Sequence, residues 1–182
     1  MPNTKAIGVA FADPELVSGT TVTGAVIVGG SITGTTIDAT ARISSNIPAG
    51  FAATQQGATV ATTGNSDVFV IAPANGVLSA ARFSGTDALT ASDANFITFS
   101  ITNLGQAGAG SAAMLAATDA NTTKATGGTG LSANAARSLA LSGTAANLVV
   151  SAGDRLRIRA AATGTLANTV TFPVYSLVFT VA

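Results

Sequence analysis

Runs of alternating apolar and polar residues occupy most of the chain beyond residue 66. In the run NFITFSITN at 95–103, Ile97, Phe99 and Ile101 fall on one side of an extended strand, because successive strand side chains point to opposite faces. Similar runs between turn-forming residues predict strands at 68–72, 77–84, 111–115, 137–141, 147–151, 154–162 and 170–181. Eight short strands without a clear helical period favour an all-β domain at 67–182, an antiparallel β-sandwich of jelly-roll-like form.

A different pattern, with a period of five, runs through residues 17–40. One phase of this period is aliphatic, at Val22, Ile27, Ile32 and Ile37. A single flat strand does not explain it, since residues five apart point to opposite faces of a strand. We expect a β repeat kinked at its glycines, in which each turn buries its aliphatic residue against its neighbours. The pattern leaves open whether one chain or three wind this repeat, and a low-complexity linker is the alternative.

The segments on either side of the repeat have other patterns. Residues 1–16 contain one short apolar alternation, Ile7, Val9 and Phe11, which ends at a turn-forming Asp-Pro pair. A single strand has no partner for its backbone groups, so this segment is expected to be a docking arm or disordered rather than part of a core. Residues 41–66 contain proline, glycine and paired glutamines, which predicts a linker with one edge strand near 59–62.

The composition limits the chemistry open to this chain. It has no cysteine and no histidine, which excludes disulfides, Cys or His nucleophiles, and the usual zinc and copper sites. Eight basic and eight acidic residues give a net charge of zero, so neither nucleic acid nor an anionic membrane is an expected partner. No signal peptide or membrane span is evident, which indicates synthesis in a reducing cytosol. Because only 9% of residues are charged, we expect other subunits to cover much of the surface.

Three arginines form the one cluster of charge in the sequence. Arg155, Arg157 and Arg159 stand at every second position of one predicted strand, so they share a face at a spacing of about 6.6 Å. They are candidates for contact with an acidic partner, for which a protein surface is a better choice than nucleic acid. The favoured alternative is a solvated row paired with acids such as Asp154 or Asp87.

The acidic residues offer no catalytic pair. They stand singly in turns, so no two can be assigned as acid and base. Two Asp-Ala-Asn triplets, at 93–95 and 119–121, place oxygen ligands two residues apart, but turns that open loops are the better interpretation. Tyr175 and Phe172 could stack on a sugar, although aromatic residues this near the last strand more often fill a core. We expect no enzyme, no metal site and no cofactor.

Three parts follow one another in this chain. They are the arm MPNTKAIGVAFADP, the repeat TVTGAVIVGGSITGTTID, and a sandwich that contains SAARFS, FITFSITN, MLAATDANTTKATGGT, LSGTAANLVVSAGDRLRI and TGTLANTVT. This organisation resembles the accessory virion proteins of tailed bacteriophages, in particular head-decoration and head-fibre proteins. The resemblance implies a structural protein on the capsid exterior, assembled in the host cytoplasm and bound to the major capsid protein.

The resemblance also implies roles for particular residues. Ile7, Val9 and Phe11 would anchor the arm on the capsid, and the four aliphatic residues of the repeat would form the interface of a homotrimer. The sandwich would project outward. Tail-fibre and receptor-binding proteins share these parts, so a module that binds a glycan through its sandwich loops is the alternative. A hydrolytic enzyme would need two carboxylates in one cleft, and we do not expect it.

Overall fold

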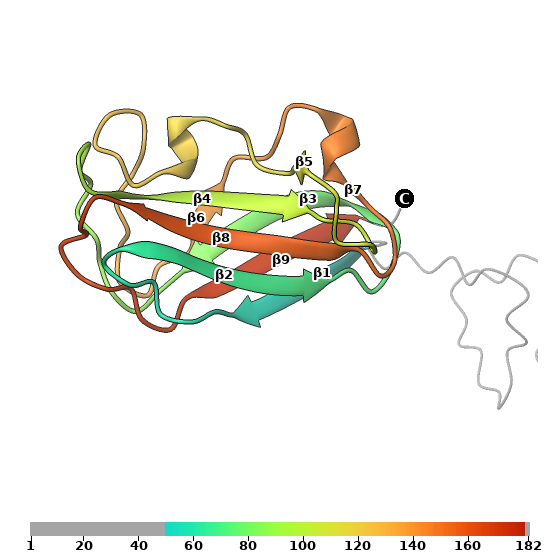
Figure 1. Cartoon of the computed structure of the whole chain (residues 1–182), viewed down its shortest axis with the longest axis horizontal. Coiled ribbons are helices and arrows are strands. Elements are labelled where there is room, and N and C mark those ends of the chain that lie inside the picture. The colour runs from blue at the N-terminus through green and yellow to red at the C-terminus, as the bar shows by residue number, and fades with distance from the viewer. Residues whose placement is uncertain (1–49, 181–182) are drawn as a thin grey trace, which may run out of the picture. The chain divides into compact units, whose positions relative to one another are not determined.

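The computed structural model describes residues 50–180, which form two antiparallel β-sheets that face each other (Figure 1). The docking arm expected at 1–16 and the repeat expected at 17–40 lie outside the described residues. The same holds for the site residues that were assigned to them, which are Ile7, Val9, Phe11, Val22, Ile27, Ile32 and Ile37.

Nine strands make up the described part of the chain. One sheet has the order β1 (Gly50–Gln56), β9 (Val174–Thr180), β3 (Gly76–Ser84) and β6 (Arg137–Leu139), with β7 (Val149–Val150) also paired to β3. The other sheet has the order β2 (Gly64–Ile71), β8 (Arg155–Thr163), β4 (Phe96–Asn103) and β5 (Ala112–Ala113). The connections contain two single-turn 3-10 helices, η1 (Asp119–Asn121) and η2 (Ala145–Leu148).

The strand pairs are nested along the chain. β1 pairs with β9, β2 with β8, β3 with β6 and β7, and β4 with β5, all antiparallel. The chain therefore follows the course of one long hairpin wound into two sheets, which is the strand order of a jelly roll when β6 and β7 count as one position. The all-β, antiparallel sandwich predicted from the alternating runs is confirmed.

The core lies between the sheets, and the strands β4, β8 and β9 place every second residue in it along most of their length. Ile97, Phe99 and Ile101 of β4 are buried, as their alternation predicts. The ring of Phe99 packs on Phe83 of the opposite sheet with the two centroids 4.7 Å apart, and Tyr175 of β9 lies 5.2 Å from Phe83. These aromatic contacts join the sheets at their centre, so Tyr175 serves the core rather than a sugar site.

Tyr175 brings a polar group into this core. Its side chain is 1% exposed, and its hydroxyl has no hydrogen-bond partner among the residues that the structure describes. Burial raises the pKa of this hydroxyl far above its usual range. Phe172, in contrast, is 64% exposed and has a φ of 47°, a left-handed conformation that a bulky residue seldom adopts.

The sandwich begins earlier than the sequence pattern predicts. Residues 50–66, placed in a linker by that pattern, contain β1 and the first residues of β2. The edge strand expected near 59–62 does not form, because Val60 makes only an isolated bridge there; the edge strand of this segment is β1, at Gly50–Gln56. Pairing with β9 stabilises β1, because the Phe51 ring stacks on Phe179 with centroids 4.6 Å apart.

Candidate functional site

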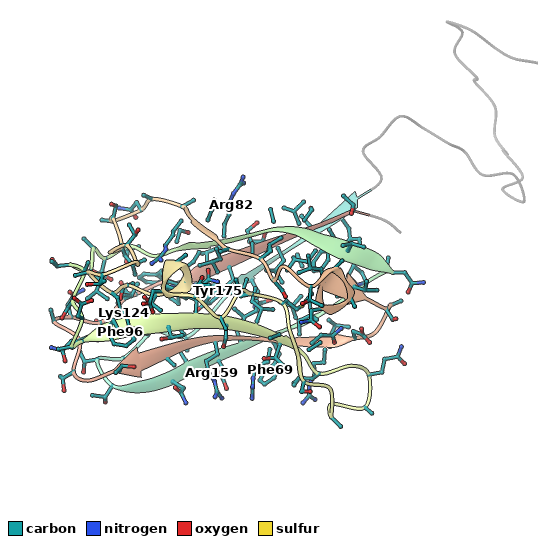
Figure 2. The ribbon with its side chains drawn as sticks, turned by 90° about the horizontal axis from the view of Figure 1, so that it is seen from above. Phe69, Arg82, Phe96, Lys124, Arg159 and Tyr175 are labelled. Atoms are coloured by element: carbon teal, nitrogen blue, oxygen red, sulfur yellow. The ribbon has the colours of Figure 1, made fainter. Side chains whose placement is uncertain are left out.

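The outer face of the β2–β8–β4–β5 sheet carries the arginine row. Strand alternation in β2 turns Val70 inward and leaves Phe69 and Ile71 outward, where they are 48% and 56% exposed. Figure 2 shows Phe69 and Arg159 on one side of the sandwich and Arg82 on the opposite side. Large apolar side chains thus stand in the open beside the row of charges.

Arg159 is the arginine of this row that forms an ion pair. Its Nε and one terminal nitrogen donate to the two carboxylate oxygens of Asp67, both at 2.6 Å, across the β2–β8 pair. This two-point hydrogen bond from Arg159 holds the pKa of Asp67 below its usual range, and the carboxylate in turn raises the pKa of Arg159. Arg159 is therefore structural, although its partner is not one of the acids suggested by the sequence.

Those two acids are engaged elsewhere. Asp154 accepts hydrogen bonds from the Asn103 amide at 2.9 Å and from the Ser151 N–H at 2.8 Å. Asp87 accepts from the hydroxyl and the N–H of Thr171, and these bonds lower its pKa. Both carboxylates therefore brace loops, and neither neutralises the arginine row.

Neither Arg155 nor Arg157 forms an ion pair with a residue in 50–180. The Arg155 guanidinium lies 5.2 Å from the centroid of the Phe69 ring, a cation–π contact that holds the ring in the open. Arg157 stands between Phe69 on β2 and Thr102 on β4. Its Nε is buried and has no hydrogen-bond partner within residues 50–180. We name the surface formed by Phe69, Ile71, Arg155 and Arg157 the arginine face.

A groove opens along the edge of β4 that faces away from β8, because the segment after β5 changes its pairing partner. The Met114 N–H donates to the Ile101 carbonyl of β4 at 2.9 Å. The Met114 carbonyl, however, accepts from the Ser142 N–H, and the Ala116 N–H donates to the Ala140 carbonyl, both at 2.9 Å. Met114 is therefore the residue at which the chain leaves β4 and pairs with the segment that follows β6.

The chain returns to β4 at Thr122 and Thr123 and closes the groove there. Thr122 bridges to Thr98, the Thr123 N–H donates to the Ile97 carbonyl at 2.9 Å, and the Thr123 hydroxyl accepts from the Ile97 N–H at 2.8 Å. The edge of β4 is covered at both ends and open between them, at residues 99–101.

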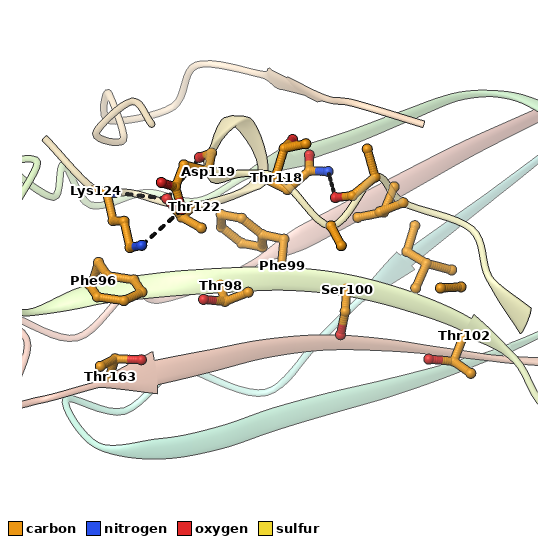
Figure 3. Close-up of a pocket in the computed structure, with 16 residues that line it drawn as sticks. Phe96, Thr98, Phe99, Ser100, Thr102, Thr118, Asp119, Thr122, Lys124 and Thr163 are labelled. Carbon is orange, nitrogen blue, oxygen red and sulfur yellow. Dashed lines mark hydrogen bonds and ion pairs between the residues drawn. The ribbon is translucent and has the colours of Figure 1, made fainter. Parts of the chain in front are cut away.

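The groove has a volume of about 480 Å³ (Figure 3). At one end the Lys124 ammonium lies 4.9 Å from the centroid of the Phe96 ring and 2.8 Å from a carboxylate oxygen of Asp119. Because this cation and this carboxylate pair with each other, the lining has no net charge. The lining includes six residues with hydroxyl side chains, Thr98, Ser100, Thr102, Thr118, Thr122 and Thr163.

Two side chains fix the roof of the groove, residues 115–124. Asn121 is 1% exposed; its amide donates to the Ala116 and Ala140 carbonyls at 2.8 Å and accepts from the Ala140 N–H at 2.7 Å. Arg137 of β6 donates at 2.6–2.7 Å to three backbone carbonyls, those of Ala120, Thr122 and Thr129. The roof is therefore held in one conformation by side chains from outside β4.

The two Asp-Ala-Asn triplets take part in such loop contacts. Asp93 accepts hydrogen bonds from the Thr126 N–H at 2.8 Å and from the Thr126 hydroxyl at 2.9 Å, and these bonds lower its pKa. Asp119 pairs with Lys124, and Asn121 holds the roof as described. No group of three acidic side chains within 50–180 is placed to hold a metal ion.

Comparison with known proteins adds no assignment. No family model matches this chain, and no curated protein matches it. No helix in the described part of the chain is long and apolar enough to cross a membrane. The function is therefore argued from the arginine face and the groove.

The sequence pattern indicated part of these surfaces. It found the arginine row but gave no role to Phe69 and Ile71, because the run VFVIA is equally typical of a strand buried on both faces. No local signal separates Phe69 and Ile71 from Val68 and Val70, because all four residues are apolar. Nothing in the sequence marked the groove, which depends on a change of pairing partner.

Proposed function

We propose that the chain is a non-enzymatic virion protein that decorates or cements the capsid of a tailed bacteriophage by binding its major capsid protein. The observation that carries this proposal is the arginine face, where Phe69 and Ile71 are exposed beside Arg155 and Arg157. Aromatic residues and arginine are enriched at the centre of protein–protein interfaces, and they often carry most of the binding energy. Single exposed apolar residues are common, but this group adjoins two charges of one sign.

The charges define the surface that the partner needs. On and beside the arginine face, Arg155, Arg157 and Arg159 supply three positive charges and Asp67 supplies one negative charge, which leaves a net charge of +2. Since Asp67 already neutralises Arg159, the excess belongs to Arg155 and Arg157. A complementary capsid surface would place carboxylates opposite these two residues, around an apolar patch that covers Phe69 and Ile71.

The remaining parts of the chain fit the same proposal. The arm at 1–16 would anchor the protein through Ile7, Val9 and Phe11, and the repeat at 17–40 would wind three copies together through its aliphatic residues. A trimer presents three arginine faces, so that individually weak contacts act together. The protein would work on the capsid exterior after assembly in the host cytoplasm, with neither nucleic acid nor a membrane as its partner.

Co-sedimentation with capsids that lack this protein tests the proposal. The capsids come from the phage that encodes the chain, grown with the gene deleted, and the purified full chain is added back. Replacing Phe69 and Ile71 by serine should weaken binding by roughly tenfold or more, because each residue buried in an interface centre contributes about 1 kcal/mol or more. Arg155→Glu, which reverses a charge of the arginine face, should weaken binding as well. Arg82→Glu is its matched control, since Arg82 is exposed on the opposite sheet.

Two results would count against the proposal. Wild-type protein that stays in the supernatant would remove the capsid as a partner. Binding that survives deletion of residues 1–16 would remove the anchoring role of the arm, while leaving the role of the arginine face to be decided by its own variants.

A second candidate function is that of a receptor-binding or glycan-binding module. The groove beside β4 favours it, because its lining combines hydroxyl groups, an aromatic ring and a self-neutralised ion pair. Binding of the full chain to a glycan array is the direct test of this candidate.

A further inference from the structure

We propose that the groove beside β4 binds a neutral saccharide, with the exposed edge of that strand as its floor. This inference rests on the second candidate function and does not depend on binding to a capsid. It names a site, at residues 96–102 and 115–124, that neither the arginine row nor the expected loop site includes.

The floor of the groove is strand backbone with unused hydrogen-bonding groups. Ile97 and Ile101 turn their carbonyls to this edge, where the Thr123 N–H of the roof donates to the first and the Met114 N–H, just before the roof, donates to the second. Peptide groups repeat their direction every two residues along a strand, so the N–H and the carbonyl of Phe99 point the same way. No hydrogen bond from the described residues of the roof reaches Phe99. Buried backbone groups are almost always matched, so a ligand that both donates and accepts hydrogen bonds fits this position.

The closed ends of the groove select a compact ligand. An added peptide strand would have to continue along the edge of β4 in both directions. That edge is already taken by Ala113 opposite Thr102 at one end and by Thr122 opposite Thr98 at the other. A ligand must therefore enter from the outer face and occupy the three-residue opening. A volume of about 480 Å³ lies within the range of small-molecule sites, roughly 300–1,000 Å³.

The lining selects a neutral and hydroxylated ligand. A threonine or serine hydroxyl both donates and accepts, which matches a sugar hydroxyl; of the lining hydroxyls, that of Thr122 is already bonded to Asp119 and Lys124. Asp119, whose side chain is 48% exposed, offers carboxylate oxygens to adjacent hydroxyls, and Lys124 offers donors beside it. Because these two charges cancel, the lining residues give an anionic ligand no net attraction; the neighbouring Arg157, opposite Thr102, lies outside the lining. The Phe96 ring supplies an apolar surface for the C–H face of a sugar ring.

The roof is already ordered for binding. Asn121 and Arg137 hold it through hydrogen bonds to its backbone and to Ala140, so a ligand does not have to order this segment. Preorganisation of this kind lowers the entropic cost of binding.

The test combines an array with two tyrosine variants of the full chain. A labelled sample is applied to an array of neutral and acidic oligosaccharides, and a bound saccharide is titrated into ¹⁵N-labelled protein while amide shifts are followed. Ser100→Tyr places a ring in the middle of the open interval, and Ser138→Tyr, at an exposed serine of β6, is the matched control. Asp119→Ala is a second variant that removes an exposed side chain and leaves the strands intact.

We expect a neutral saccharide to bind and to shift the amides of Phe99 and Ile101. Ser100→Tyr should weaken this binding at least about tenfold, Asp119→Ala several-fold, and Ser138→Tyr not measurably. If no saccharide binds, the second candidate function fails together with this site. If a saccharide binds but shifts other amides, or is unaffected by both groove variants, the glycan function stands and the site is wrong. Binding of acidic saccharides alone would also overturn the inference.

Discussion

Removal of the Arg137 side chain should destabilise the sandwich more than removal of any exposed arginine. Arg137 donates three hydrogen bonds, at 2.6, 2.7 and 2.6 Å, to the carbonyls of Thr129, Ala120 and Thr122. Its guanidinium also lies 5.5 Å from the centroid of the Phe99 ring. The Thr122 carbonyl keeps a second bond, from the Thr129 N–H at 3.2 Å, whereas the variant leaves the Ala120 and Thr129 carbonyls without a donor from the described residues.

The magnitude follows from the number of bonds and their exposure. A hydrogen bond from a charged donor contributes about 1.5–3 kcal/mol when buried and less when exposed, and two of these three bonds are exposed. We take about 1 kcal/mol for each, so Arg137→Ala should lower the free energy of unfolding by about 3 kcal/mol. For a domain of this size, that corresponds to a fall in Tm of roughly 10 °C.

Urea unfolding followed by circular dichroism measures this difference. Arg82→Ala is the control, because Arg82 lies on the neighbouring strand β3 opposite Ser138 and is exposed; its variant should change the free energy by less than about 0.5 kcal/mol. Arg137→Lys should lie between the two, since an ammonium cannot reproduce the planar donor fork. If Arg137→Ala unfolds at the same urea concentration as Arg82→Ala, the reasoning about the roof is wrong.

Three further predictions concern single residues. Tyr175→Phe should leave the free energy of unfolding unchanged or raise it by up to about 1 kcal/mol, because the buried hydroxyl has no partner in the described part of the chain. A fall of about 1 kcal/mol in urea unfolding would show instead that the hydroxyl makes a stabilising contact. The Arg159 hydrogen bond lowers the pKa of Asp67 in the folded state. The ionised carboxylate therefore contributes its full stabilisation at pH values above 3.8, the ordinary pKa of aspartate, and this stabilisation is lost as the pH falls through the lowered folded pKa. Between pH 5 and pH 2 the Tm of the wild type should therefore fall more steeply than the Tm of Asp67→Asn. Parallel curves of Tm against pH would refute this assignment. Phe172→Gly should stabilise the fold by about 1 kcal/mol, because glycine adopts the positive φ without strain; a lower Tm would show that the exposed ring makes a needed contact.

The alternation of apolar residues was sufficient to predict the long strands. β3, β4, β8 and β9 begin and end within a few residues of the predicted runs, since each has one face in the core and one outside. β1 was missed because GFAATQQ has a single large apolar residue, and it depends on pairing with β9. Its stability lies in a contact distant in sequence, which a local pattern does not contain.

The segment at 109–125 shows why the groove could not be predicted. Its alanines favour a helical turn or two, yet the structure has the two-residue β5 and one 3-10 turn there. Met114 divides its hydrogen bonds between Ile101 of β4 and Ser142, which lies in the segment that follows β6. Tertiary pairing overrides the local preference, and the same change of partner exposes the edge of β4. Arg137, which holds the roof, carries no motif that would distinguish it from any other arginine in a strand.

The most direct test of the proposed capsid role is a cryo-electron microscopy reconstruction of capsids decorated with the full chain. It would show which face of the sandwich approaches the shell. We predict density for the jelly roll on the capsid exterior, with Phe69 and Ile71 against the major capsid protein and acidic residues opposite Arg155 and Arg157. Density in which this face points into solvent, or a shell without added density at saturating protein, would contradict the account.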